Sequence, residues 1–242
     1  MSKRDLAEWI CQNNYPGRGI AMGISEDGQY GVIVYFIMGR SEISQSRMFV
    51  RTSDGIIIKL LKTPQLTDHS LIVYTPVRKY GEKIIVTNGD QTDTIHEYLA
   101  KGMLFEDALR TRSFEQDAPH YTPRISGMMS IHNSTVMYQL SIIKSGGHPE
   151  LPLRFFFNYP GWASGEGHYI HTYCQDAHPL PSFIGEPKQA VLSGNIDTFT
   201  ENIWNSLNTD KRISLFVLFR HLQTGREESR IINKFCAKGC LE

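Results

Sequence analysis

The sequence lacks an excess of charge of either sign and any apolar run long enough to cross a membrane. Lysine plus arginine and aspartate plus glutamate number 25 each among the 242 residues, so no global field attracts nucleic acid or an anionic membrane. The longest apolar stretch, Val32–Met38, is far shorter than the roughly 20 residues that a transmembrane helix needs. An anionic ligand must therefore be bound by a local cluster of cations.

Cysteine is scarce, and its four copies form no paired motif. Cys11, Cys174, Cys236 and Cys240 are scattered and include no CxxC spacing. The N-terminal sequence is polar and contains no apolar signal segment. We therefore expect free thiols and a cytoplasmic protein that binds neither membrane nor nucleic acid.

Several catalytic motifs are missing as well. The chain has no GxxxxGK[ST] phosphate loop, which argues against a P-loop nucleotide triphosphatase. Gly17-Arg18-Gly19 has no third glycine at the dinucleotide-binding spacing and leads into a predicted strand. No serine has glycines two residues before and after it, so the nucleophile elbow of the α/β-hydrolases is excluded.

Four potential metal ligands, His168, His171, Cys174 and His178, lie close in sequence. On a strand, His168 and His171 point to opposite faces. His168 and Cys174 share a face, but six residues of strand separate them by roughly 20 Å. Zinc ligands must converge within a few ångströms. The sequence therefore predicts histidines in an aromatic, polar segment and no metal site.

Segments rich in Val and Ile and bounded by turn residues predict strands over much of the chain. Asp27-Gly28 between two such segments indicates a hairpin, because glycine tolerates positive φ. Asn133-Ser134 is expected to form a second turn between strands. The predicted strands are Arg18–Ile24, Tyr30–Met38, Met48–Arg51, Ile56–Leu60, Leu71–Val77, Lys83–Thr87, Arg124–His132, Thr135–Ile143, Arg154–Phe157, Gly167–Tyr173, Ile213–Arg220 and Arg230–Phe235.

Three segments show helical periodicity instead. In the first, Thr92 and Asp93 are candidate caps and Gly102 ends the helix. In the last, Thr198 and Glu201 have the spacing of a capping box. The predicted helices are Thr92–Lys101, Leu104–Arg112 and Thr198–Leu207.

The order of these elements predicts an α+β fold, with two antiparallel sheets and the helices outside them. We expect one domain over residues 1–242, with an inserted segment at about 144–189. That segment is rich in Gly, Pro, His and aromatic residues, and aromatic side chains at this density need burial. It is therefore expected to be structured, and whether it acts as a lid is left open.

Three stretches and one tyrosine match the archaeal-type IMP cyclohydrolase family, in order and at compatible spacing. The second stretch resembles the family signature V-S-N-G-x-x-T-D-x-I, and the alignable part runs from about Tyr15 to Gly127. The matching residues are Tyr15-Pro-Gly-Arg18-Gly with the loop Arg40–Arg47, then Val86–Ile95, then Phe114-Glu115-Gln116-Asp117 leading into Thr122-Pro123-Arg124-Ile125, and Tyr74.

The resemblance implies a four-layered αββα fold similar to that of the N-terminal nucleophile hydrolases. It also implies that 5-formamidoimidazole-4-carboxamide ribonucleotide is closed to IMP with loss of water, in de novo purine biosynthesis. The carboxamide nitrogen attacks the formyl carbon, and the carbinolamine then loses water. This chemistry needs proximity, polarisation of the formyl oxygen and proton transfer. It needs no redox cofactor and no metal.

The resemblance places Arg47, Tyr74 and Glu115 at the catalytic centre. Glu115 is expected to transfer protons, because burial among apolar neighbours raises the pKa of a carboxylate toward neutrality. Tyr74 can donate a hydrogen bond to the formyl oxygen as charge develops there. Arg47 is always cationic and suits the phosphate or the developing oxyanion.

Further residues of the matching stretches are candidate substrate ligands: Asn88, Thr92 and Asp93, where a strand passes into a helix, together with Arg18 and Arg124 as anion-binding groups. Several of the candidate residues have a structural alternative. Thr92 and Asp93 could be helix caps, and Arg47 and Arg124 could form weak surface ion pairs. Tyr74 could be an ordinary strand aromatic, and Glu115 a solvated residue that closes a helix. Function is favoured because all of these residues lie in motifs that match one family.

The chain also departs from the family pattern. The N-terminal extension and the 144–189 segment have no counterpart in the shorter archaeal proteins, and the Arg40–Arg47 loop lacks the family's proline-asparagine before its arginine. Two rival functions follow. One is an amidohydrolase with a processed N-terminal nucleophile, for which Cys11 is the one residue near the first strand to consider. The other is a non-catalytic purine-nucleotide-binding protein. Homo-oligomer formation is left open.

Overall fold

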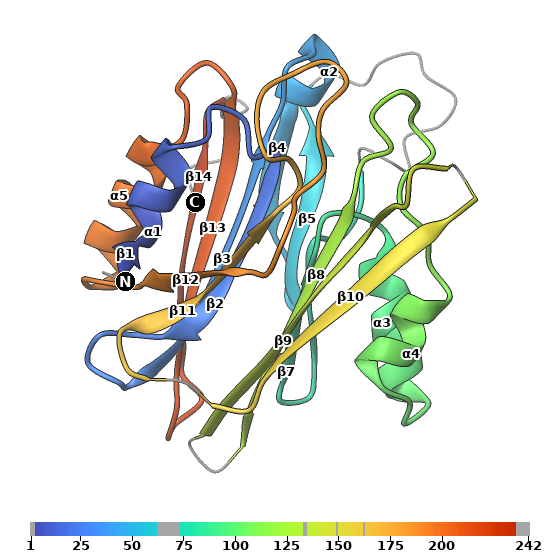
Figure 1. Ribbon diagram of the computed structural model, residues 1–242. Helices are drawn as coiled ribbons and strands as arrows, with labels where there is room; N and C mark the ends of the chain where they lie inside the picture. The colour runs from blue at the N-terminus through green and yellow to red at the C-terminus, as the bar shows by residue number, and fades with distance from the viewer. Residues whose placement is uncertain (1–2, 62–72, 133–134, 149, 162, 236–242) are drawn as a thin grey trace.

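The computed structural model describes residues 3–61, 73–132, 135–148, 150–161 and 163–235, and it consists mainly of two sheets packed face to face (Figure 1). Among these residues, every strand pair is antiparallel except β1–β12, which is parallel. The first sheet has the order β1 (Arg4–Asp5), β12 (Lys188–Val191), β11 (Glu166–His171), β2 (Arg18–Ile24), β3 (Tyr30–Met38), β13 (Arg212–His221), β14 (Glu227–Asn233). The second has the order β10 (Pro152–Tyr159), β9 (Thr135–Ser145), β8 (Arg124–His132), β7 (Lys83–Thr87), β6 (Val77–Tyr80), β5 (Gly55–Leu60), β4 (Arg47–Arg51).

The helices lie on the outer faces of the two sheets (Figure 1). Helices α1 (Leu6–Cys11) and α5 (Ile196–Ser206) cover the first sheet, and α3 (Gln91–Ala100) and α4 (Phe105–Arg110) cover the second. The short helix α2 (Glu42–Gln45) lies between β3 and β4. The predicted α+β class is confirmed. No helix in the described part of the chain is long and apolar enough to span a membrane.

Three hydrophobic clusters hold these layers together, and β3 contributes to two of them. Ile33, Tyr35 and Ile37 face the second sheet in the central cluster. Val34 and Phe36 point the other way and pack with side chains of α1 and α5. Since both faces of β3 are buried, its sequence is a continuous apolar run instead of an alternating one. The third cluster joins α3 and α4 to the second sheet.

Most predicted strands are confirmed to within a few residues, but two are displaced. The strand predicted at Leu71–Val77 is wrong where it can be compared: residues 73–76 are not in a strand, and β6 begins at Val77. Pro76 has no N–H and cannot donate to a sheet. The last strand, β14, begins three residues earlier than predicted and ends at Asn233. Residues 71–72, the Asn133-Ser134 turn and both C-terminal cysteines lie outside the described residues.

The predicted helix caps are wrong at both helices concerned. Helix α3 begins at Gln91 with Asp90 at its N-cap, so Thr92 and Asp93 lie within its first turn. In α5, Asn195 caps the helix, and its Oδ1 accepts hydrogen bonds from the backbone N–H groups of residues 197 and 198, each at 3.0 Å. The helix therefore starts two residues before the predicted capping box.

The 144–189 segment supplies strands to both sheets. It contributes β10 at one edge of the second sheet and β11 in the interior of the first, between β12 and β2. These strands are part of the sandwich, and Tyr173 and Leu180 of the same segment line a cavity described below. That the segment is an insertion relative to the archaeal proteins stays a prediction.

Candidate active site

A cavity of about 370 Å³ is lined in part by residues of α2, which lies at one end of the sandwich (Figure 1). The start of β2, the end of β3 and the loops before β8 and after β11 converge there. Its wall is rich in arginine and aromatic side chains. It is lined by Tyr15, Arg18, Met38, Arg40, Ser41, Ile43, Ser44, Arg47, Glu115, Asp117, His120, Thr122, Tyr173 and Leu180.

Arg47 begins β4 and is 3% exposed. Its Nε donates to the carbonyl of Ser44 at 2.9 Å, and its Nη2 donates to the carbonyl of Met38 at 3.2 Å. Burial, followed by the neighbouring Arg18 cation, lowers the pKa of Arg47 below its ordinary value. Arg47 thus joins the end of β3 to α2 through Nε and Nη2. Its side chain also lines the cavity.

Glu115 is the buried carboxylate of the site, at 5% exposure. Its backbone N–H donates to the Thr122 carbonyl at 3.0 Å, which holds the loop before β8 in place. Burial raises the pKa of Glu115, and the cations Arg18 and Arg124 oppose that rise. Glu115 lines the cavity, so its carboxylate is placed to meet a ligand.

Arg18 is the electrostatic partner of this carboxylate. Burial acts to lower the pKa of Arg18, but Glu115 and Tyr173 raise it, and the pKa lies well above its ordinary value. Among the described residues, its Nε has no hydrogen-bond partner. Arg18 therefore remains charged and has donor capacity for an anionic or carbonyl group.

Tyr74 lies beside the cavity without lining it. It is 7% exposed, and its hydroxyl is 2.9 Å from that of Tyr35 on β3. Tyr74 also acts electrostatically on both Arg18 and Arg47. The structure thus brings the three residues predicted for the catalytic centre together with Arg18.

Arg124 lies behind Glu115 and is connected to Asn88. Its Nη1 donates to Gln91 Oε1 at 2.6 Å and pairs with Asp90 at 2.7 Å. Gln91 Nε2 in turn donates to Asn88 Oδ1 at 3.1 Å. Asn88 is fully buried, donates to the Pro123 carbonyl and accepts from Ile125 N–H. Asn88 is therefore linked to the charges of the site through Gln91 and Arg124.

Thr92 and Asp93 are not on the cavity wall. Thr92 is fully buried, and its hydroxyl is 2.6 Å from that of Thr87, where it fixes the start of α3. Asp93 is exposed and pairs with Arg78 at 3.0 Å. A role of these two residues in substrate binding stays a prediction.

Sequence reasoning missed several wall residues. Tyr15 and Tyr173 stack with ring centroids 5.8 Å apart, and the Arg40 guanidinium lies 5.1 Å from the Tyr15 ring. Tyr15, Arg40 and Asp117 lie in the family-like stretches, so that resemblance could have found them. Tyr173 and His120 are outside those stretches, and only the folded chain brings them to the cavity.

The two histidines of β11 are buried in separate contacts. His168 Nδ1 is 2.7 Å from the Tyr138 hydroxyl, and His171 Nδ1 is 2.9 Å from the Tyr173 carbonyl. Burial lowers the pKa of each to about 4. No group of three or more His, Cys, Asp or Glu side chains suited to a metal ion comes together in the ranges that the structure describes.

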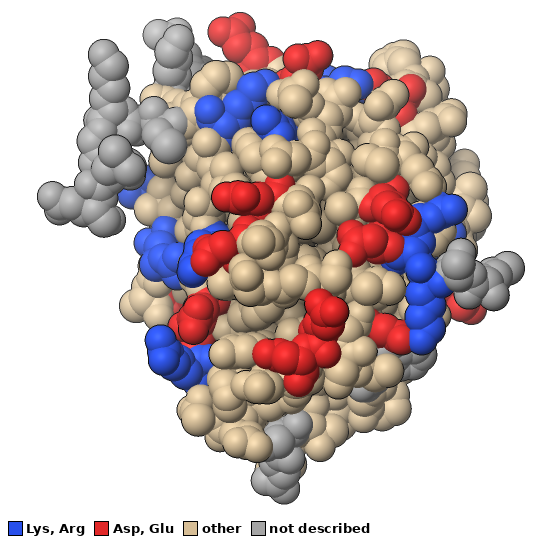
Figure 2. Space-filling model, turned by 90° about the vertical axis from the view of Figure 1, so that its left-hand side faces the viewer, with Lys and Arg blue, Asp and Glu red and all other residues tan. Residues whose placement is uncertain are grey.

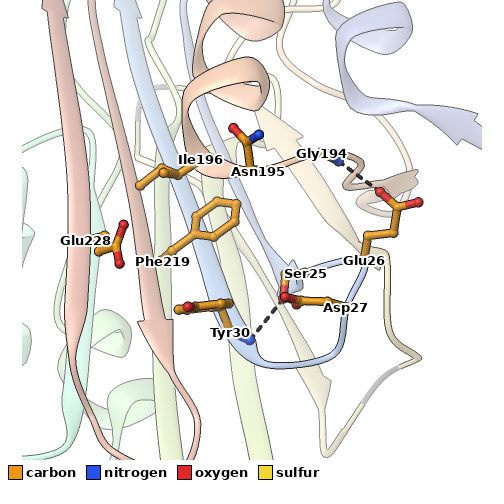
Figure 3. Close-up of a pocket in the computed structure, with 9 residues that line it drawn as sticks. All are labelled: Ser25, Glu26, Asp27, Tyr30, Gly194, Asn195, Ile196, Phe219 and Glu228. Atoms are coloured by element: carbon orange, nitrogen blue, oxygen red, sulfur yellow. Dashed lines mark hydrogen bonds between the residues drawn. The ribbon is translucent and has the colours of Figure 1, made fainter.

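A larger cavity, of about 460 Å³, lies at the opposite end of β2 (Figure 3). Its wall combines the rings of Tyr30 and Phe219 with the carboxylates of Glu26, Asp27 and Glu228. Figure 2, which views the side of α1 and α5, shows acidic side chains across the middle of that face and basic ones toward its margins. Carboxylates repel a phosphate, so the arginine-lined cavity is the better candidate for an anionic ligand.

The chain is similar to known proteins of one family. The model of a family described as IMP cyclohydrolase-like protein matches residues 15–225. The IMP cyclohydrolase of Methanopyrus kandleri is 34% identical over 116 residues, 46% of this chain and 57% of that protein. The IMP cyclohydrolase of Methanosphaera stadtmanae is 30% identical over 120 residues, 48% of this chain and 58% of that protein. These alignments thus span little more than half of each relative.

Proposed function

The chain belongs to the IMP cyclohydrolase-like protein family, and we propose that it is an IMP cyclohydrolase acting on 5-formamidoimidazole-4-carboxamide ribonucleotide. The observation that carries the proposal is the buried Glu115 carboxylate next to Arg18 and Arg47 in a cavity of about 370 Å³. Every residue that lines this cavity lies within the range of the family match. The relatives named above are IMP cyclohydrolases, which supports the same reaction here.

The reaction has two steps that these groups can serve. In the first, the carboxamide nitrogen bonds to the formyl carbon, and one N–H proton passes to the formyl oxygen. In the second, the C–O bond breaks, the former formamide nitrogen loses its proton, and water departs. Glu115, with its raised pKa, accepts the first proton and returns it to the oxygen. Arg18 and Arg47 stabilise the negative charge that develops on the formyl oxygen.

The remaining residues have supporting roles in this proposal. Tyr74 lies beside the cavity with its hydroxyl 2.9 Å from that of Tyr35, and we expect it to donate toward the formyl oxygen when the substrate is bound. Arg124 lowers the cost of a buried Glu115 anion and is itself held by Gln91 and Asp90. Arg40, the most exposed of the three arginines on the cavity wall, suits the phosphate.

The arrangement of two sheets between two helical layers supports the finer assignment of an αββα fold like that of the N-terminal nucleophile hydrolases. The chemistry proposed here differs from theirs. Cys11 lies in α1, on the outer face of the first sheet, and is absent from the cavity wall. The observation favours cyclisation over catalysis by a processed N-terminal cysteine.

The test is turnover by the purified full chain. We expect conversion of the formamido ribonucleotide to IMP, followed by ultraviolet absorbance and chromatography, without added folate, ATP or metal. Protein that binds IMP but never forms it would establish the non-catalytic rival. Intact mass spectrometry addresses the other rival, since an active chain that retains residues 1–10 cannot use a processed N-terminal nucleophile.

A further inference from the structure

Three side chains that the proposed mechanism does not use form a hydrogen-bonded chain ending on the cavity wall. Asp117 Oδ1 accepts from Thr122 N–H at 2.6 Å, and Asp117 Oδ2 accepts from the Thr122 hydroxyl at 2.5 Å. The Thr122 Oγ1 is 2.6 Å from the Tyr173 hydroxyl. All three residues line the cavity.

The direction of this chain follows from the number of protons. An ionised carboxylate has none to donate, and a threonine hydroxyl has one. Because Thr122 gives its proton to Asp117, it can only accept from Tyr173. The Tyr173 proton is therefore committed to Thr122, and its oxygen keeps a lone pair that can accept a hydrogen bond from a ligand.

The surrounding structure fixes the Tyr173 ring. It stacks on Tyr15 at an interplanar angle of 12° and packs against Gly17, where an added Cβ would lie 2.5 Å from Tyr173 Cδ2. The backbone carbonyl of Tyr173 accepts from Asn13 Nδ2 at 2.8 Å and from His171 Nδ1. Burial raises the pKa of Tyr173 to about 12, so the hydroxyl is neutral at physiological pH.

Tyr173 adds a neutral acceptor to a wall on which the arginines can only donate. The cations there, Arg18, Arg40 and Arg47, are all donors and suit phosphate and carbonyl oxygens. A carboxamide nitrogen carries two protons, of which the proposed mechanism uses one at Glu115. The Arg18 backbone N–H donates to Thr172 Oγ1 at 3.1 Å, which places Arg18 beside Tyr173, and Glu115 lines the same cavity.

We propose that Tyr173 accepts a hydrogen bond from the second carboxamide N–H and thereby selects ribonucleotides with an amide over those with a carboxylate. This inference rests on the proposed ring closure for the identity of the substrate. Asp117 and Thr122 are positioning residues, since they act by directing the Tyr173 proton away from the ligand. A ligand carboxylate at the same place would bring one of its oxygens, an acceptor, against the Tyr173 oxygen, which is also an acceptor, and no hydrogen bond could form.

The experiment compares two ligands that cannot cyclise, the 5-amino-imidazole ribonucleotides with a carboxamide or a carboxylate at position 4. Their dissociation constants are measured by calorimetry for the wild type, Thr122→Val and Thr122→Ser. In Thr122→Val the Tyr173 proton is free to point at the ligand. We expect the carboxylate ligand to gain affinity relative to the carboxamide ligand, so that the ratio of their dissociation constants changes by on the order of tenfold in its favour. Thr122→Ser keeps the hydroxyl and should restore the wild-type ratio.

Asp117→Asn provides a second variant if Thr122→Val does not fold. With the amide nitrogen of the new side chain facing Thr122, that nitrogen donates to the threonine hydroxyl, which then donates to Tyr173. The whole chain thus reverses with its hydrogen bonds intact, and the ratio should again move toward the carboxylate. Because this variant also removes a negative charge, its charge control is Asp54→Asn, at a half-buried position off the cavity wall whose carboxylate pairs with Arg78.

The outcomes separate this inference from the proposed function. A wild type that forms IMP, with Thr122→Val and Asp117→Asn both keeping the wild-type ratio, overturns the acceptor role and leaves the cyclohydrolase proposal standing. A shifted ratio in a protein that never forms IMP supports the acceptor role and overturns the proposed reaction. Equal loss of affinity for both ligands shows a merely structural role for Thr122 and overturns the inference.

Discussion

Glu115 is a carboxylate among arginines, and two effects on its pKa oppose each other. Burial favours the neutral acid, whereas Arg18 and Arg124 favour the anion, and the net pKa is raised. As a proton acceptor, Glu115 is active when ionised, so activity should rise as pH increases through this raised pKa. We expect the acid limb of the kcat/KM profile to lie above pH 4.5, the ordinary value for this group.

Glu115→Gln keeps the shape of the side chain but cannot take a proton. We expect kcat to fall roughly 100-fold or more, and the acid limb to disappear from the pH profile. IMP should still bind, since the role lies in the transition state. Glu42→Gln, at an exposed position in α2, is the control. An acid limb that persists in Glu115→Gln would assign the titration to another group.

Arg47 combines its charge with a defined geometry, because Nε and Nη2 are bound to two backbone carbonyls. Arg47→Ala should lose on the order of 2–4 kcal/mol of transition-state stabilisation, measured from kcat/KM. Arg47→Lys restores the charge but has no planar fork, so it should recover only a part of that loss. An unchanged kcat/KM in Arg47→Ala would remove this residue from the mechanism.

The site could be predicted in part because some of its residues are local to matching stretches. Arg18, Arg47 and Glu115 belong to these stretches, and the fold brings them to one cavity. Tyr173 has no such local signal. Its place on the wall depends on β11 pairing with β2, a contact between segments about 150 residues apart, and no pattern in its own neighbourhood specifies that pairing.

At the level of helices and strands, α5 was predicted correctly as a helix, but its N-cap residue was not. Two overlapping patterns were present, Asn195 before the helix and Thr198 with Glu201 inside it. The structure uses Asn195, whose Oδ1 accepts from two backbone N–H groups. Sequence spacing alone cannot choose between them, since the choice depends on where Ile196 and Phe199 pack in the core.

Asn195→Ala should therefore lower the free energy of unfolding by about 1–2 kcal/mol, because it leaves helix N–H groups without their acceptor. Chemical denaturation measures the change. Glu201→Ala tests the capping box that the sequence predicted, and it should change stability by less than about 0.5 kcal/mol. A larger effect at Glu201 than at Asn195 would contradict the observed cap.

The strands also differ in how far their own sequence predicts them. The Tyr30–Met38 run was predictable because burial of both its faces leaves a long apolar sequence. The 144–189 segment is predicted to be a structured insertion from its aromatic-rich composition and from its lack of a counterpart in the shorter archaeal proteins. Which sheet receives a strand is decided by packing against distant residues, so the separate destinations of β10 and β11 were not visible in that composition.

For the molecule as a whole, the two buried histidines of β11 couple stability to pH. The pKa of His171 is about 4 in the folded chain, against an ordinary value of 6.5. Between these values the unfolded chain binds a proton that the folded chain does not. Stability therefore rises with pH from about 4 to 6.5 and falls as the pH is lowered through this window.

We expect His171 to contribute about 3 kcal/mol to this loss on acidification. His171→Gln should reduce the slope of unfolding free energy against pH between 4 and 6.5, measured by urea denaturation at a series of pH values. His132→Gln, at the exposed end of β8, should leave the slope as it is. Equal slopes in all three proteins would mean that folding does not lower the pKa of His171.

The position of β11 inside the first sheet has a consequence for synthesis on the ribosome. Strands β2 and β3 emerge early, whereas β11, which pairs with the other edge of β2, follows roughly 140 residues later. At about 5–20 residues per second, that edge waits on the order of 7 to 28 s for its partner. An apolar strand with one unpaired edge is a surface that other nascent chains can join. The demand on molecular chaperones should thus be greatest before residue 166 is made.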